Sequence, residues 1–126
     1  MSNVEPLATS PEILREAIIN MAVESWRFGR VFERLLMKLD AGKQKRYQSQ
    51  FRWFLKKVEE GLEQAELKLV NLEGQRFDPG MSATPLNIEE FGADDVLVVE
   101  QMLEPVIMGK EGLVRTGTVI LAKEAA

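Results

Sequence analysis

Two heptad patterns in the first part of this chain restrict its possible folds more strongly than any other property. Alternating steps of four and three residues place side chains on one stripe of an α-helix. The first pattern comprises Leu14, Ile18, Met21, Ser25, Phe28, Phe32, Leu35 and Leu39. The second comprises Phe51, Leu55, Val58, Leu62, Ala65, Leu69 and Leu72. Nearly all of these positions are apolar, so the sequence predicts two long amphipathic helices.

Local signals predict where these helices begin and end. A hydroxyl residue followed by proline and glutamate favours a helix start, and Ser10, Pro11 and Glu12 follow that order. Between the two patterns the segment 40–42 ends in glycine, which predicts that the first helix stops there. Gly61 lies inside the second pattern, where glycine costs a helix up to about 1 kcal/mol relative to alanine. We therefore expect a flexible segment over residues 1–9 and a helical stem over residues 10–73.

The apolar stripes of such a hairpin need a cover. A lone pair of helices has little to bury them against, and a second copy of the same chain is the simplest cover. We therefore expect a homodimer in which two hairpins form a four-helix bundle. The expected dimerisation residues are Leu14, Ile18, Met21, Phe28, Phe32, Leu35, Leu55, Val58 and Leu62.

The pattern changes at Gly74. Prolines and glycines are frequent from there to residue 95 and predict loops with short extended pieces. β-Branched and apolar runs then follow at 96–99, 102–103, 106–108, 113–115 and 118–121, with a turn at 109–112. Pro105 lies among these runs and requires an edge or a bulge. The expected fold class is α+β: an N-terminal helical hairpin, forming a coiled-coil or four-helix-bundle stem on dimerisation, followed by a small C-terminal β-domain over residues 74–126.

The composition narrows the possible chemistry. The 126-residue chain contains no cysteine and no histidine, so it cannot build a thiol nucleophile, a disulfide or a Ser-His-Asp triad. We expect no enzyme activity, no cofactor and no metal site. The absence of cysteine fits the cytoplasm. The first residues lack the basic start and apolar core of a signal peptide, and no apolar run approaches the roughly 20 residues of a membrane span. We therefore expect a cytoplasmic protein without a membrane partner.

One local group of paired carboxylates could suggest acid–base catalysis. It consists of Glu89, Glu90, Asp94 and Asp95. These residues lie beside turn residues, without a nucleophile or a glycine-rich phosphate loop nearby. We interpret them as turn acids.

A basic stretch interleaved with aromatic residues could suggest nucleic-acid binding. It contains Lys43, Lys45, Arg46, Tyr47, Phe51, Arg52, Trp53, Phe54, Lys56 and Lys57. However, Phe51 lies on the apolar stripe, and the net charge of the chain is −4, whereas nucleic-acid binding normally requires a basic excess. We expect no nucleic-acid partner. Trp26, Trp53 and Phe54 lie beside the stripes and either widen the bundle interface or mark a partner surface.

Three segments occur in an order that carries a family resemblance. Residues 35–40 read Leu-Leu-Met-Lys-Leu-Asp, and residues 74–79 read Gly-Gln-Arg-Phe-Asp-Pro. The third segment comprises residues 98–103, Val-Val-Glu-Gln-Met-Leu, followed by residues 112–123, Gly-Leu-Val-Arg-Thr-Gly-Thr-Val-Ile-Leu-Ala-Lys. They resemble the leucine-rich helical segment, the joint and the closing hairpin of GrpE-type nucleotide exchange factors, the co-chaperones of DnaK-type chaperones. The resemblance covers about residues 31–123.

This resemblance implies a function without catalytic groups. A GrpE-type β-domain binds the nucleotide-binding domain of a DnaK-type chaperone, holds its cleft open and promotes ADP release. Position by position, the resemblance implies partner contacts by Leu103, Met108, Arg115 and Leu121. From the residue types alone, Leu103 and Leu121 also fit a β-core, and Arg115 also fits a structural ion pair.

The joint residues have a structural interpretation. Phe77 would anchor the joint, Asp78 would bond the turn backbone, and Pro79 would end the helix. Other positions depart from the family: Ser82-Ala83-Thr84 stands where a His-Glu-Ala triplet is usual, and Arg115-Thr116-Gly117 where Arg-Pro-Ala is usual. The departures leave a second hypothesis, a non-catalytic dimeric adaptor or protein-interaction module on a GrpE-like scaffold without exchange activity.

Overall fold

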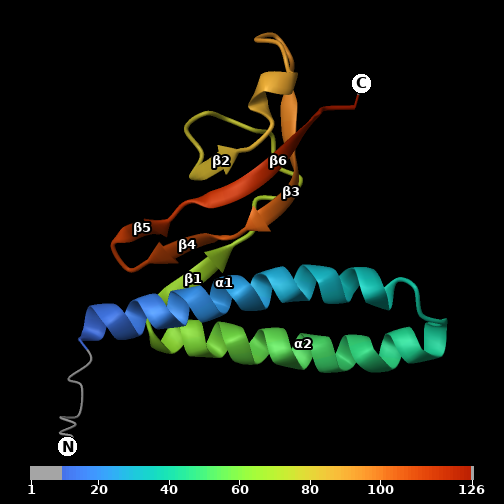
Figure 1. Cartoon of the computed structure of the whole chain (residues 1–126), viewed down its shortest axis with the longest axis vertical. Helices are drawn as coiled ribbons and strands as arrows, with labels where there is room; N and C mark the ends of the chain where they lie inside the picture. The colour runs from blue at the N-terminus through green and yellow to red at the C-terminus, as the bar shows by residue number, and fades with distance from the viewer. Residues whose placement is uncertain (1–9, 126) are drawn as a thin grey trace, which may run out of the picture.

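The protein has two antiparallel helices followed by a small β region of two three-stranded sheets (Figure 1). The computed structural model describes residues 10–125, so the segment 1–9, predicted to be flexible, lies outside it. Helices α1 (Pro11–Leu36) and α2 (Ala41–Gln64) lie side by side, and the sheets stand on one side of the pair. This arrangement is the α+β fold class that the sequence predicts.

Helix α1 begins as predicted. Ser10 is its N-cap, because the side-chain oxygen accepts a hydrogen bond from the Ile13 N–H at 3.2 Å, and Pro11 occupies the first turn. At the other end, the Gln44 side chain donates a hydrogen bond to the Leu36 carbonyl at 3.1 Å. This bond satisfies one of the carbonyl groups that a helix end leaves unpaired.

The break between the helices has a different cause from the predicted one. The prediction that Gly42 stops the first helix is wrong, because Gly42 lies in the first turn of α2. Asp40 is the N-cap of α2, and its Oδ1 accepts a hydrogen bond from the Lys43 N–H at 3.0 Å. The start signal for α2 therefore fixes the break, since a capping aspartate stabilises a new helix.

Helix α2 ends earlier than the second heptad pattern. The prediction that this pattern stays helical through Leu69 and Leu72 is wrong, because α2 ends at Gln64. Glu66 adopts a φ of +59°, in the left-handed region, and turns the chain out of the helix. Strand β1 (Leu67–Val70) follows directly, so a strand lies within the range 10–73 that the sequence predicts as helical.

The first sheet has the order β1-β4-β5 and lies against the helices. Strand β4 (Val106–Gly109) pairs antiparallel with β1 and with β5 (Gly112–Arg115). Strand β5 begins directly after the tight turn from β4 with Gly112, whose φ of +122° favours glycine. Ile107 from this sheet packs with Ile19, Val23 and other apolar residues of both helices. The buried members of this helix–sheet core are Ile19, Ala22, Val23, Leu62, Leu67 and Ile107.

The second sheet lies farther from the helices and has the order β2-β6-β3. Strand β6 (Gly117–Lys123) pairs in parallel with β2 (Ala83–Pro85) and antiparallel with β3 (Leu97–Glu104), which contains two register shifts. A short 3₁₀ helix, η1 (Ile88–Glu90), lies between β2 and β3. The buried members of this second core are Leu97, Val99, Met102, Val106, Val119 and Leu121.

The strands after residue 96 lie close to their predicted positions. However, the expected continuous strand over 96–108 divides into β3 and β4, and the expected last strand over 113–121 divides into β5 and β6, with one half of each in either sheet. Pro105 separates β3 from β4 and is buried, so its missing N–H interrupts neither ladder. The chain thereby passes directly from the second sheet to the first.

Candidate functional site

The predicted partner contacts lie on or near the last strands, and the structure exposes them unequally. Leu121 is 2% exposed and belongs to the second core. The structure corrects the prediction for this residue, because a side chain buried in the core cannot reach a partner. Met108 is half-buried and packs on the same core, and Leu103 is half-buried on β3. These strands therefore offer less apolar contact surface than the family resemblance implies.

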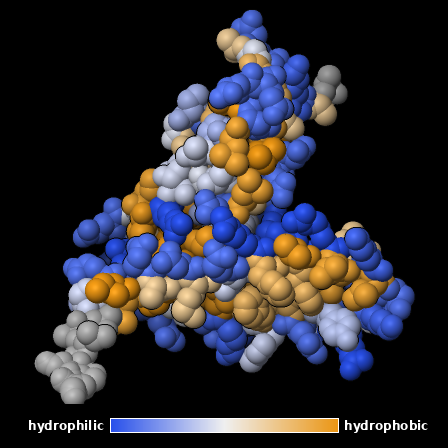
Figure 2. Space-filling model, viewed as in Figure 1, coloured by the Kyte–Doolittle hydropathy of each residue, from blue (hydrophilic) through white to orange (hydrophobic). Residues whose placement is uncertain are grey.

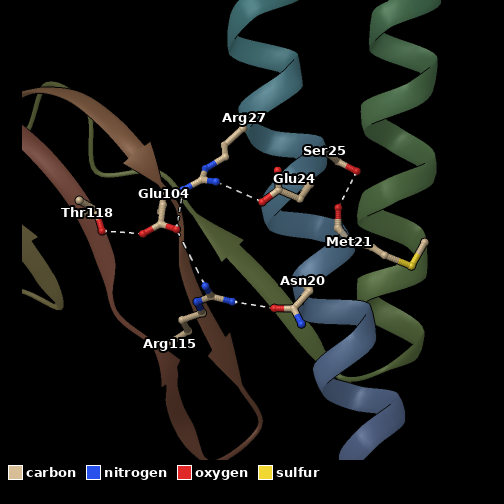
Figure 3. A network of polar contacts seen from close by, with 8 residues as sticks. All are labelled: Asn20, Met21, Glu24, Ser25, Arg27, Glu104, Arg115 and Thr118. Atoms are coloured by element: carbon tan, nitrogen blue, oxygen red, sulfur yellow. Dashed lines mark hydrogen bonds and ion pairs between the residues drawn. The ribbon is translucent and has the colours of Figure 1, made fainter.

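Arg115 faces α1 and joins a polar network, which we call the α1–sheet clamp (Figure 3). Its Nη1 donates a hydrogen bond to Asn20 Oδ1 at 3.1 Å, and its Nη2 lies 3.9 Å from Glu104 Oε2. The Glu104 carboxylate also accepts hydrogen bonds from Arg27 Nη2 at 3.0 Å and from Thr118 Oγ1 at 2.8 Å. The clamp connects one helix to β3, β5 and β6. Arg115 therefore forms a hydrogen bond and an ion pair within its own chain, which was the alternative to a partner contact.

The joint residues have two of their three predicted roles. Phe77 packs on the second core and donates its N–H to the Leu97 carbonyl at 2.8 Å. Asp78 accepts a hydrogen bond from the Gly80 N–H at 2.9 Å through Oδ1, which shapes the turn. Pro79 does not end a helix, because α2 has already ended at Gln64 and a strand intervenes.

The predicted dimerisation residues of α1 divide into two groups. Four of them are exposed: Leu14, Met21, Phe28 and Leu35. The other two are half-buried inside the chain itself. Ile18 packs against the helix–sheet core, and the Phe32 ring lies 5.4 Å from the Phe51 ring of α2, measured between centroids. Only the exposed group is fully available to a second copy.

The predicted dimerisation residues of α2 contact their own chain. Leu62 is 3% exposed and belongs to the helix–sheet core. Val58 packs against that core, and Leu55 lies between the helices, where it lines a groove. The structure corrects the prediction for Leu62, since its side chain is already buried.

A different heptad on α1 is exposed throughout, and we call it the exposed stripe. Its members are Leu14, Ala17, Met21, Glu24, Phe28, Val31 and Leu35. Met21 is 71% exposed and Phe28 is 63% exposed. Apolar side chains form a band along α1 in the space-filling view (Figure 2). The sequence shows that Ala17 and Val31 are apolar, but it contains two neighbouring apolar stripes on α1. Only the packing in the structure shows that α2 covers the stripe through Ile18 and Phe32.

A shallow groove of about 360 Å³ lies between the helices beside the exposed stripe. Met21 and Ser25 line it from α1, and Val58 and Gly61 line it from α2. A Cβ added to Gly61 would meet nothing within 4 Å. The missing side chain therefore leaves room next to the exposed stripe.

Trp26, Trp53 and Phe54, which could either be buried or mark a partner surface, differ in their burial. Trp26 is half-buried, packs on the second core, and lies under the Arg30 guanidinium at 5.1 Å from the ring centroid. Trp53 is 60% exposed, with Lys57 Nζ 4.5 Å from its ring centroid, and Phe54 is exposed as well. Burial therefore applies to Trp26 alone, and the other two lie on the outer surface of α2.

The acidic residues of the 89–95 segment shape its turns. Glu89 and Glu90 belong to η1, and Asp95 accepts a hydrogen bond from the Gly92 N–H at 2.8 Å. Within residues 10–125, no cluster of three or more acidic, histidine or cysteine side chains is placed to hold a metal ion. Neither helix in that range is both long and apolar enough to cross a membrane.

Comparison with known proteins identified no relative. No family model matches the chain, and no similar curated protein or solved structure was found. The function therefore has to be inferred from the exposed stripe, the α1–sheet clamp and the grooves of the helical hairpin.

Proposed function

We propose that this protein is a non-catalytic, homodimeric helper that binds another protein in the cytoplasm, and that the exposed stripe is its dimer interface. The exposed stripe is the observation that carries this proposal. Single exposed apolar residues are common on protein surfaces, but a contiguous row of them marks an interaction site. The row here contains five large apolar side chains, Leu14, Met21, Phe28, Val31 and Leu35.

The geometry of the stripe favours a second copy of the chain as its cover. From Leu14 to Leu35 the stripe runs for about 32 Å, at about 1.5 Å per residue. A stripe with steps of three and four fits another helix with the same period, and a second α1 has it. Glu24 at its centre is paired with Arg27 at 3.2 Å, which reduces the repulsion between two copies. The neighbouring groove at Gly61 gives space for a side chain of the partner helix.

A pair of charge substitutions tests the interface. We expect Met21→Glu combined with Phe28→Glu to convert the dimer to a monomer, because burying four added carboxylates in the dimer is unfavourable. Both side chains are exposed in the single chain, so the helical circular dichroism should not change. Trp53→Glu is the matched control, since Trp53 is also 60% exposed but belongs to the outer surface of α2. Sedimentation velocity that shows the double variant still dimeric would contradict the proposed interface.

The specific function that we propose is GrpE-like co-chaperone activity towards a DnaK-type chaperone. The order of elements supports it together with the sequence resemblance: a helical hairpin, the joint at Phe77–Pro79, and a β region that ends with the antiparallel pairing of β6 with β3. Such a helper needs only a surface that binds the open nucleotide cleft better than the closed one, because differential affinity shifts the equilibrium. ADP release then accelerates without a catalytic group.

Arg115 is the residue through which this activity can be tested. Its side chain keeps 36% exposure, and its 3.9 Å approach to Glu104 is too long for a hydrogen bond. A carboxylate on the chaperone can therefore compete for its guanidinium. We expect the protein to accelerate release of a fluorescent ADP analogue from the chaperone, and Arg115→Ala to remove the acceleration.

A matched variant distinguishes a direct contact between Arg115 and the chaperone from a structural role of Arg115. Asn20→Ala removes the hydrogen-bond partner of Arg115 but keeps the guanidinium, so acceleration should persist. Equal loss in both variants would mean that Arg115 acts through the clamp. No acceleration by the folded wild-type dimer would contradict the exchange activity and favour the adaptor function, which the burial of Leu121 also favours.

A further inference from the structure

A larger groove lies between the C-terminal half of α1 and the middle of α2, and its volume is about 650 Å³. Apolar side chains line its floor, and three arginines line its rim. The floor residues Leu36, Phe51 and Leu55 are buried or half-buried. The rim arginines are Arg30, Arg34 and Arg52, and Glu33 also lines the groove. We call it the arginine groove. It shares no lining residue with the exposed stripe, so the dimer interface proposed above does not itself include this groove.

The rim carries unbalanced positive charge. Arg30 is neutralised, because it pairs with Glu73 and lies 3.5 Å from Glu33. Arg34 instead donates its Nε–H to the Arg30 carbonyl at 3.4 Å. Among residues 10–125, neither Arg34 nor Arg52 forms an ion pair. Arginine stays charged at all ordinary pH values, so two cations at the groove lack a counter-charge.

The sequence around Arg52 adds to this positive field. Residues 41–58 contain six lysines and arginines and no aspartate or glutamate, although the whole chain has a net charge of −4. Such separation of charge attracts acidic groups to one surface. The α2 side of the groove is thus complementary to a negatively charged ligand.

We propose that the arginine groove binds an acidic peptide segment of a partner protein. An aliphatic or aromatic side chain of that segment packs on Phe51 and Leu55, and its carboxylates pair with Arg34 and Arg52. The planar guanidinium suits carboxylates, because it donates two parallel hydrogen bonds. Gln48 at the rim provides an amide for the peptide backbone.

The apolar floor favours a peptide over a nucleic acid. A concave site with an apolar lining and a few polar groups binds ligands that bury apolar surface. Nucleic acids rely instead on many phosphate contacts, and only two rim arginines of this groove are unpaired.

Fluorescence anisotropy with a defined peptide tests the proposal. The probe is a short labelled peptide with a Leu-Phe pair between glutamates, and the comparison peptide has glutamines in their place. We expect saturable binding of the acidic peptide that weakens about tenfold or more with Arg34→Gln or Arg52→Gln, since each removes a charge-assisted hydrogen bond. Lys57→Gln is the matched control, because it removes one charge from the same helix but lines the opposite groove.

The remaining outcomes also decide the question. Equal binding of the glutamine peptide, or equal weakening by Lys57→Gln, would overturn the proposal. Tighter binding of a single-stranded oligonucleotide with the same arginine dependence would show a polyanion site instead. Peptide binding should persist in the Met21→Glu, Phe28→Glu variant, which separates this proposal from the dimer interface. If the peptide dissociates the wild-type dimer, the groove is covered by the second copy and the proposal is wrong.

Discussion

Gly117 begins β6 at a point where three groups from β3 and β4 come close to its Cα. A Cβ at this position would lie 2.8 Å from Met102 Cε, 2.9 Å from Val106 Cγ2 and 3.0 Å from the Glu104 carbonyl oxygen. Met102 and Val106 are fully buried, so neither side chain has free space to move into. Position 117 therefore requires glycine for steric reasons. The close packing of the second core explains the small residue here, and a contact with a partner protein is not needed to explain it.

We expect Gly117→Ala to destabilise the protein by about 1–3 kcal/mol, because an added methyl group overpacks the second core. Urea denaturation followed by circular dichroism measures the change. Thr116→Ala is the control: its side chain is exposed, and its effect should stay within about 0.5 kcal/mol. If Gly117→Ala unfolds at the same urea concentration as the wild type, β3, β4 and β6 are not closely packed around position 117.

The transition from α2 to β1 depends on the backbone conformation of Glu66. Its φ of +59° lies in a region that costs non-glycine residues about 1–2 kcal/mol. Its only ion pair among the described residues is with Lys110 at 3.5 Å, between two well-exposed side chains, and such pairs contribute little. The backbone conformation, and not the side chain, is therefore what this position requires.

We expect Glu66→Gly to stabilise the protein by up to about 1 kcal/mol, since glycine adopts this conformation without strain but loses more chain entropy. Glu63→Gly provides the opposite control. Glu63 lies in the last turn of α2, where glycine should destabilise by about 1 kcal/mol. Thermal denaturation of the two variants measures both changes, and a destabilising effect at both positions would mean that Glu66 remains helical.

The α1–sheet clamp connects α1 to the sheets, because Glu104 of β3 contacts Arg27 of α1, Arg115 of β5 and Thr118 of β6. We expect Glu104→Gln to accelerate amide hydrogen exchange in β5 and β6, since the loss of charge weakens the bonds from Arg27 and Thr118. Glu24→Gln is the control, because Glu24 contacts Arg27 within α1 alone. Unchanged exchange in the Glu104 variant would show that apolar packing alone orients the sheets.

Sequence patterns predict the two helices and the last strands because these elements follow one period each. They miss the end of α2, since Leu69 fits both the continued heptad and, together with Leu67, the alternation of a strand. The pairing of β1 with β4 decides between the two, and that contact joins residues far apart in the chain. Patterns also cannot show which apolar stripe of α1 is covered. That choice depends on the packing of α2 against Ile18 and Phe32.

We propose that the exposed stripe of α1 lies against a second copy of the chain. Glu24 is the central position of the exposed stripe. The two Glu24 residues of such a dimer therefore lie close together whether the two α1 helices run parallel or antiparallel. The chain has no cysteine, so one introduced thiol reports on one place. Ser49 lies exposed on the outer surface of α2 and gives a matched reference position.

The most direct measurement is therefore cross-linking of Glu24→Cys with a short bis-maleimide, compared with Ser49→Cys under the same conditions. We predict nearly complete conversion of the Glu24→Cys protein to a covalent dimer at concentrations where the Ser49→Cys protein stays uncoupled. If Glu24→Cys couples no faster than Ser49→Cys, the exposed stripe is not a dimer interface, and the proposed homodimer is wrong.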